Sequence, residues 1–134
     1  MLFIFRKEFI KFSAILLLLF SNSAYSQYYW GAVYVDKNTR IAGGSYNMSS
    51  ESEAKKVALD SCVKKHNGKS NNCVFAQSFY NGCVSIYIGN NAKGGWGVNG
   101  IDTYNAKFQA AQACQESGGI ECREVLSFCT TRYY

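Results

Sequence analysis

The sequence predicts an α+β fold in which two ββαβ repeats form one pseudo-symmetric domain. Two observations lead to this prediction. An alanine-rich segment that ends in a cysteine occurs twice, as residues 54–62 and 106–114. Each copy follows a strand pattern with a glycine pair and precedes a second cysteine and an apolar run ending in Ser-Phe. Neither copy can bury its apolar face alone, so we expect one shared core, with about six strands, two helices packed on the sheet and three disulfides.

The first repeat is predicted to contain two strands, a helix and a third strand. Apolar and aromatic runs predict the strands, which cover residues 30–35, 41–46 and 73–79. Ser50 and Glu53 have the spacing of a capping box, so a helix is expected from that point to about Lys65. Asn67-Gly68 then ends the helix.

The second repeat follows directly and has the same order of elements. Its predicted strands cover residues 83–88, 94–98 and 122–130. Asp102 is expected to cap the second helix, and Gly118-Gly119 to end it. The helical spacing of Ala106, Ala110 and Cys114 predicts that these residues face the sheet.

The first 26 residues have the pattern of a secretory signal peptide. Three basic residues accompany an apolar run over 14–20 that is too short to span a bilayer. Ala24 and Ser26 are small residues at the two positions that a signal peptidase reads, so cleavage is expected after Ser26. An uncleaved anchor is the alternative, because residues 1–12 are themselves rather apolar.

The mature chain, residues 27–134, is expected to be a single domain, with its repeats over about 28–82 and 83–134. Without the leader, the chain contains 11 Lys and Arg residues and 8 Asp and Glu residues, which gives a net charge of +3. The basic residues are scattered, so no nucleic-acid partner is expected. No membrane span is expected after cleavage, and the predicted location is the periplasm or the extracellular medium.

All six cysteines lie in the mature part. An even number of cysteines in a small exported domain predicts three disulfides, for which 15 connectivities are possible. The internal symmetry favours pairing each helix cysteine with the cysteine that opens the following strand. The last two cysteines then pair by elimination, which gives Cys62–Cys73, Cys114–Cys122 and Cys83–Cys129.

Side chains for catalysis or metal binding are few. His66 is the only histidine and no C-x-x-C motif occurs, so no metal site and no other cofactor is predicted. A catalytic histidine would also need a positioned nucleophile and an orienting acid, which the sequence does not identify. A hydrolase could use a pair of carboxylates, but Glu121 and Glu124 lie three residues apart and so point to opposite faces of a strand. The carboxylate of Asp36, Asp60 or Asp102 could still lie near one of them in space. No catalytic residue is assigned.

Aromatic residues give the strongest functional signal, because the mature chain holds nine tyrosines and two tryptophans. Tyrosine and tryptophan are enriched in binding surfaces, and alternation along strands would place some of them on the outside. The alternative is that they only cover a thin domain. We predict that Trp30, Tyr46 and Trp96 bind a partner. Trp96 is a candidate because the equivalent position in the first repeat is Gly44, so the architecture does not require a bulky side chain there.

Several motifs along nearly all of the mature chain belong to one pattern. They are Trp30-Gly31-Ala32, the helix from Glu53 to Cys62, Cys73-Val74-Phe75, Asn81-Gly82-Cys83, Gly94-Gly95-Trp96-Gly97, and Ala106 to Cys114 with Cys122. This pattern resembles the bacterial exported domain-of-unknown-function family 4189. The resemblance implies export and a structural set of disulfides. It implies no reaction, and a role as a host-directed effector is one alternative that it suggests.

The sequence therefore predicts an exported, non-enzymatic binding module that recognises a protein or a glycan in the envelope or outside the cell. An inhibitor or immunity-type protein is one concrete form. A small secreted hydrolase and a host-directed effector are the alternatives. A histidine or an acid pair in an open pocket would favour the hydrolase, whereas a flat aromatic patch would favour the binding module.

Overall fold

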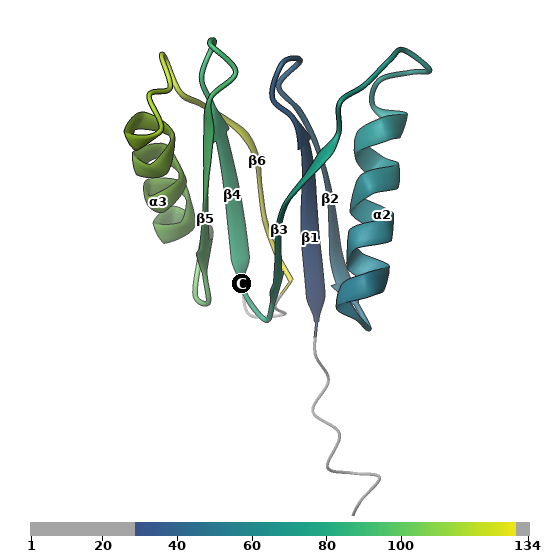
Figure 1. Cartoon of the computed structure of the whole chain (residues 1–134). Helices are drawn as coiled ribbons and strands as arrows, with labels where there is room; N and C mark the ends of the chain where they lie inside the picture. The colour runs from purple at the N-terminus through teal and green to yellow at the C-terminus, as the bar shows by residue number, and fades with distance from the viewer. Residues whose placement is uncertain (1–28, 131–134) are drawn as a thin grey trace, which may run out of the picture.

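The computed structural model describes residues 29–130, and these form four layers (Figure 1). Six strands make two three-stranded sheets that lie between α2 on one side and α3 on the other. The predicted α+β class with six strands and two helices is confirmed, and the strands are divided between two sheets instead of forming one. Among residues 29–130, no helix is both long and apolar enough to span a membrane. The predicted signal peptide, residues 1–26, lies outside the described residues.

The elements follow one another in the predicted order. They are β1 (Trp30–Asp36), β2 (Ile41–Met48), α2 (Glu51–Lys64), β3 (Val74–Tyr80), β4 (Cys83–Ile88), β5 (Gly94–Asn99), α3 (Thr103–Glu116) and β6 (Arg123–Cys129). We call β1, β2, α2 and β3 the first half, and β4, β5, α3 and β6 the second half. Each half is a ββαβ unit whose first strand lies in the centre of an antiparallel sheet, in the orders β2-β1-β3 and β5-β4-β6.

The two halves also share their strand register. Val33 of β1 faces Gly44, and Ile86 of β4 faces Trp96. Directly after Val33 and Ile86, the ladders to β3 and β6 shift by one residue. We therefore call two residues equivalent when they hold the same place in this register or the same place in the two helices.

Each helix begins at its predicted cap and lies close to its sheet. Ser50 accepts a hydrogen bond from the backbone N–H of Glu53, and Asp102 accepts one from that of Asn105. The buried helix positions are the same in both halves, namely Ala54, Ala58 and Cys62 in α2 and Ala106, Ala110 and Cys114 in α3. A Cβ atom on Gly43 or on its equivalent Gly95 would clash with the helix backbone. Small residues are therefore required on both sides of each contact.

The main core lies between the two sheets. It consists of apolar side chains from both halves, with Val33, Val35 and Phe79 from the first and Val84, Ile86 and Ile88 from the second. Trp96, Leu126 and Phe128 pack against this core. Because each sheet supplies one wall, neither half could keep water from its inner face alone.

The three predicted disulfides are confirmed. Cys62–Cys73 and Cys114–Cys122 join the end of each helix to the strand that follows, and Cys83–Cys129 joins the neighbouring strands β4 and β6. Within the described residues no cysteine is free. Three disulfides indicate a compartment outside the reducing cytosol.

Candidate functional site

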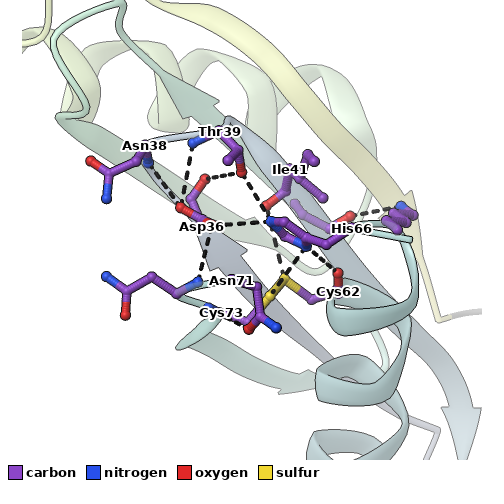
Figure 2. The surroundings of a disulfide bond; sticks show 11 residues. Asp36, Asn38, Thr39, Ile41, Cys62, His66, Asn71 and Cys73 are labelled. Carbon is purple, nitrogen blue, oxygen red and sulfur yellow. Dashed lines mark hydrogen bonds and ion pairs between the residues drawn. A yellow bond between two sulfur atoms is a disulfide. The ribbon is translucent and has the colours of Figure 1, made fainter. Parts of the chain in front are cut away.

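A buried polar cluster lies where the β1–β2 turn meets the end of α2 (Figure 2). Asp36 is 2% exposed and His66 is 5% exposed. The Nε2 atom of His66 lies 3.0 Å from Oδ2 of Asp36 and 3.2 Å from Oγ1 of Thr39. Its Nδ1 atom lies 2.8 Å from the backbone carbonyl oxygen of Cys62. Both ring nitrogens thus have close partners inside the protein.

The partners of His66 indicate its charge. A carboxylate and a backbone carbonyl only accept hydrogen bonds, so both contacts are hydrogen bonds when His66 is an imidazolium that donates from both nitrogens. Asp36 is the counterion of that form. Burial raises the pKa of Asp36, but backbone N–H groups of Asn72, Thr39 and Asn38, together with His66, donate to the carboxylate and hold its pKa below the ordinary value. The result is a buried ion pair that ties the turn, the helix end and the loop before β3 together.

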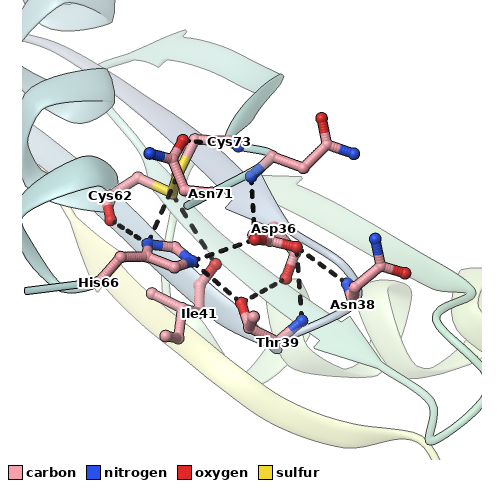
Figure 3. Close-up of polar contacts among 9 residues, drawn as sticks. Asp36, Asn38, Thr39, Ile41, Cys62, His66, Asn71 and Cys73 are labelled. Carbon is pink, nitrogen blue, oxygen red and sulfur yellow. Dashed lines mark hydrogen bonds and ion pairs between the residues drawn. A yellow bond between two sulfur atoms is a disulfide. The ribbon is translucent and has the colours of Figure 1, made fainter. Parts of the chain in front are cut away.

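The cluster has part of the geometry of a catalytic site. Asp36 is the orienting acid that the sequence did not identify for His66, and Sγ of Cys73 lies 3.9 Å from Nδ1 of His66 (Figure 3). That sulfur, however, is bonded to Cys62. A general base must reach a proton of its substrate, and both members of this pair are enclosed. The arrangement therefore stabilises the loop but offers a substrate no direct access.

The second half has no such pair at the equivalent place. Gly89 follows Ile88 as Asp36 follows Val35, and Gly118 follows Cys114 by four residues as His66 follows Cys62. There the loop is held by Asn91, which donates to the carbonyl of Gly118 at 2.9 Å and accepts from the N–H of Ile120 at 3.1 Å. A neutral amide thus does in one half what an ion pair does in the other.

A shallow hollow of about 370 Å³ opens beside the end of β3. Its walls are formed by Trp30, Glu51, Ser78, Phe79, Tyr80 and Val98. The ring centroids of Trp30 and Tyr80 are 5.1 Å apart. Ser78 donates a hydrogen bond to Glu51 at 2.8 Å. This bond is the main cause that lowers the pKa of the Glu51 carboxyl, and the hydrogen bond from Lys55 lowers it further. The hollow therefore combines an aromatic wall with a carboxylate.

The three residues predicted to bind a ligand lie in three different surroundings. Trp30 borders the hollow and packs against the alanines at the contact between β1 and α2. Tyr46 is exposed on β2, with its ring centroid 6.4 Å from that of Phe128. Trp96 is half-buried against the core between the sheets, and Nζ of Lys37 lies 5.7 Å from its ring centroid. The structure does not bring them together in one patch.

Side chains of β6 explain why the position equivalent to Trp96 is occupied by a glycine. A Cβ atom on Gly44 would lie 2.6 Å from Cε1 of Phe128 and 3.2 Å from Cδ2 of Leu126. Side chains of β6 therefore fill the space over Gly44, whereas in the second half the bulk comes from β5 itself. Trp96 thus contributes to packing between the sheets as well as to the surface.

Sequence reasoning missed a group of exposed apolar residues at the start of α3. Ile101 and Tyr104 are each 77% exposed, and Phe108 is 67% exposed. Tyr104 and Phe108 lie four residues apart, on one face of the helix. We call Ile101, Tyr104 and Phe108 the α3 patch. The equivalent residues before and on α2 are Ser49, Ser52 and Lys56, so a comparison of the two copies outside the buried stripe would have revealed the patch.

Comparison with known proteins gives one match. A family model described as Domain of unknown function (DUF4189) matches residues 30–129, which run from the first residue of β1 to the last residue of β6. No curated protein and no solved structure matches the chain.

Proposed function

The chain belongs to the family described as Domain of unknown function (DUF4189), and we propose that it acts as an exported, non-enzymatic binding module for a protein in the envelope or outside the cell. The observation that carries this proposal is the α3 patch. Three large apolar side chains that stay this exposed within eight residues of one another are typical of an interaction surface. Aromatic anchors of this kind dominate the binding energy of many protein interfaces.

Comparison with the first half indicates that the α3 patch is not needed for folding. Its helix is capped at the equivalent position and has the same buried stripe and an equivalent disulfide, yet it presents serine and lysine at the equivalent places. A surface that one copy builds from polar residues does not require apolar residues in the other copy. The apolar residues of the α3 patch are therefore available for a partner.

The chemistry of the patch favours a protein as the partner. Lys107 is the only basic residue between Ile101 and Gln112, and its Nζ lies 3.4 Å from Oε1 of Glu124. An anionic membrane surface would call for several unpaired basic residues beside the apolar ones. Ile101 and Phe108 carry no polar atom that could bind a sugar hydroxyl. An apolar protein surface fits this composition best, and an inhibitor or immunity-type role is one form of such binding.

The hollow beside β3 supports a glycan as the second candidate ligand. Trp30 and Tyr80 provide ring faces, and Glu51 and Ser78 provide polar groups at the same opening. Pockets of this composition orient small polar ligands. Calorimetric titration with oligosaccharides from the envelope tests the site, with Trp30→Ala as the binding variant and Tyr104→Ser as its control. Equal affinity of the two variants, or no heat of binding in the wild type, would exclude this candidate.

Site-specific photo-crosslinking tests the protein-binding proposal. A photoreactive phenylalanine analogue is placed at position 108 in one strain and at the equivalent position 56 in another, and cells and medium are irradiated. We expect one discrete protein adduct from position 108, none from position 56, and loss of the adduct when Tyr104→Ser is added. Leu59→Lys, an apolar-to-charged change on α2, should leave the adduct intact. Equal labelling at both positions, or no protein adduct, would reject the α3 patch as the site.

Export itself is supported by the three disulfides and by the signal-peptide pattern. Mass spectrometry of the crosslinked protein reports this directly, since an exported chain should begin near Gln27 in the periplasm or the medium. An adduct with the chain still carrying Met1 in the membrane fraction would contradict export with cleavage. A hydrolase or a host-directed effector would instead be indicated by turnover of the captured partner or by a partner of host origin.

A further inference from the structure

Three groups at the Cys62–Cys73 disulfide could ligate a metal once the disulfide is reduced, namely its two sulfurs and the ring of His66. The two sulfurs and a ring nitrogen of His66 all lie within 4.8 Å of one another. Sγ of Cys73 and Nδ1 of His66 are 3.9 Å apart (Figure 3). Zinc binds cysteine sulfur at about 2.3 Å and histidine nitrogen at about 2.0–2.1 Å, so sulfur and nitrogen ligands of one tetrahedral ion lie roughly 3.5 Å apart. The observed separation is close to this value.

The other nitrogen of His66 has the partner that metal-bound histidines usually have. Nε2 faces Oδ2 of Asp36 at 3.0 Å, and this carboxylate is itself held by three backbone N–H groups. A carboxylate on the far nitrogen fixes the ring orientation and increases the basicity of the ligating nitrogen. Nδ1 would only have to give up its proton and its bond to the carbonyl of Cys62.

We propose that reduction of the Cys62–Cys73 disulfide turns this cluster into a binding site for a thiophilic cation, Zn²⁺ or Cu⁺, with Cys62, Cys73 and His66 as ligands and Asp36 as the outer partner. The reductant is a dithiol, which gives two electrons and becomes a disulfide while the Cys62–Cys73 bond breaks and each sulfur gains a proton. Binding of the ion then releases both thiol protons and the Nδ1 proton of His66. In the reverse direction an external disulfide takes two electrons from the two thiolates and becomes a dithiol, while the Cys62–Cys73 bond forms again and the ion leaves.

The reductant and the metal ion can both approach the cluster from the side of Cys73. Cys73 is half-exposed, whereas Cys62 is fully buried, so a reductant reaches the sulfur of Cys73 first. The loop over residues 67–72 that covers the cluster is exposed throughout its length. Figure 2 shows Cys73 and Asn71 on this loop side of the cluster and His66 at the end of the helix.

The second half provides a matched control within the same molecule. Cys114 and Cys122 form the equivalent disulfide, but Gly118 stands in place of His66 and Gly89 in place of Asp36. If thiolates alone were enough to bind the ion, both halves would bind it equally. The proposal requires that only the first half does so, and it is independent of the role of the α3 patch.

Two double variants make the comparison in the mature protein. Cys114→Ser with Cys122→Ser leaves the first-half pair, and Cys62→Ser with Cys73→Ser leaves the second-half pair. Each is reduced with a phosphine without oxygen and titrated with Co²⁺, whose bonds to thiolates give a near-ultraviolet charge-transfer band. We expect one equivalent of Co²⁺ in the first variant, displaced by Zn²⁺, and at least tenfold weaker binding in the second. The oxidised wild type should show no band.

Adding His66→Asn to the first variant should weaken binding at least tenfold, and Asp36→Asn should do so to a smaller extent. Far-ultraviolet circular dichroism of the oxidised proteins shows whether these variants fold, but the main comparison does not depend on them, because it leaves His66 and Asp36 untouched. Equal affinity of the two double variants would overturn the proposal, since an unfolded reduced chain binds through any thiol pair alike. Absence of a band in the first variant would overturn it as well.

Discussion

The two halves of this domain share their packing and differ in their polar groups and surfaces. Both have a glycine strand against an Ala-Ala-Cys helix stripe and a disulfide from the helix to the next strand. They differ at the helix-end loop, where one has the Asp36–His66 pair, at the sheet interface, where one has Trp96, and at the start of the helix, where one has the α3 patch. The shared features are those that the fold requires. The differences mark the places where one copy could acquire a separate role.

The largest expected effect comes from removing one member of the buried ion pair. Asp36→Ala leaves the imidazolium of His66 enclosed without its counterion, which should lower the free energy of unfolding by about 3–5 kcal/mol. Asn91→Ala, at the corresponding loop of the second half, removes only neutral hydrogen bonds and should cost about 1 kcal/mol per bond. Urea unfolding of the two variants measures the difference. Equal losses would mean that the pair contributes no more than ordinary hydrogen bonds.

The disulfides should differ in effect according to the length of chain that each closes. The sequence separations are 46 residues for Cys83–Cys129, 11 for Cys62–Cys73 and 8 for Cys114–Cys122. Loop-closure entropy then predicts losses of about 4, 3 and 2.5 kcal/mol when each pair is replaced by serine. Thermal unfolding of the three double variants gives the order. A smaller loss for Cys83–Cys129 than for either short loop would show that strain or local packing decides the contribution.

The regular part of the fold could be predicted from the sequence because it depends on local and repeated signals. Ser50 and Asp102 begin the helices as expected, and the symmetry of the cysteines gives all three disulfides. Division into two facing sheets could not be predicted, because strand patterns do not state which strands pair. The Asp36–His66 pair joins residues 30 apart through a tertiary contact, so neither residue alone indicated it. The α3 patch lies at the start of a helix, outside the buried stripe, where helical periodicity predicts exposure to solvent but no binding role.

The sheet interface should be destabilised both by a smaller side chain at Trp96 and by a larger one at its equivalent, Gly44. Trp96→Ala removes part of the packing between the sheets and should cost about 2 kcal/mol, below the 3–5 kcal/mol of a fully buried tryptophan because the ring is half-exposed. Gly44→Ala should also destabilise, because the new Cβ meets Phe128. Chemical unfolding tests both. A neutral Trp96→Ala would assign the tryptophan to the surface and support it as a binding candidate.

The contribution of Asp36 to stability should be lost in acid. The pKa of Asp36 lies below its ordinary value of 3.8 in the folded protein, so the carboxylate stabilises the fold above about pH 4 and loses this contribution as the pH falls through the folded pKa. The stability difference between wild type and Asp36→Ala should therefore shrink in that acid range. Asn91→Ala has no titrating group at the mutated site, and its difference from wild type should stay constant. A difference for Asp36→Ala that grows in acid would contradict the assigned ion pair.

The smallest expected effect on stability is at the α3 patch. Tyr104→Ser with Phe108→Lys gives the second helix the residues of the first, and these side chains are mostly exposed. Surface changes of this kind alter the free energy of unfolding by no more than about 0.5 kcal/mol. The reverse exchange, Ser52→Tyr with Lys56→Phe on α2, should be equally mild. If the first exchange alone lowers the free energy of unfolding by more than about 1 kcal/mol, Tyr104 and Phe108 pack within this chain. The α3 patch would then be rejected as a binding surface. A mild effect of both exchanges, with capture lost only when the α3 patch is changed, would separate the binding role of this helix from the folding role that the two helices share.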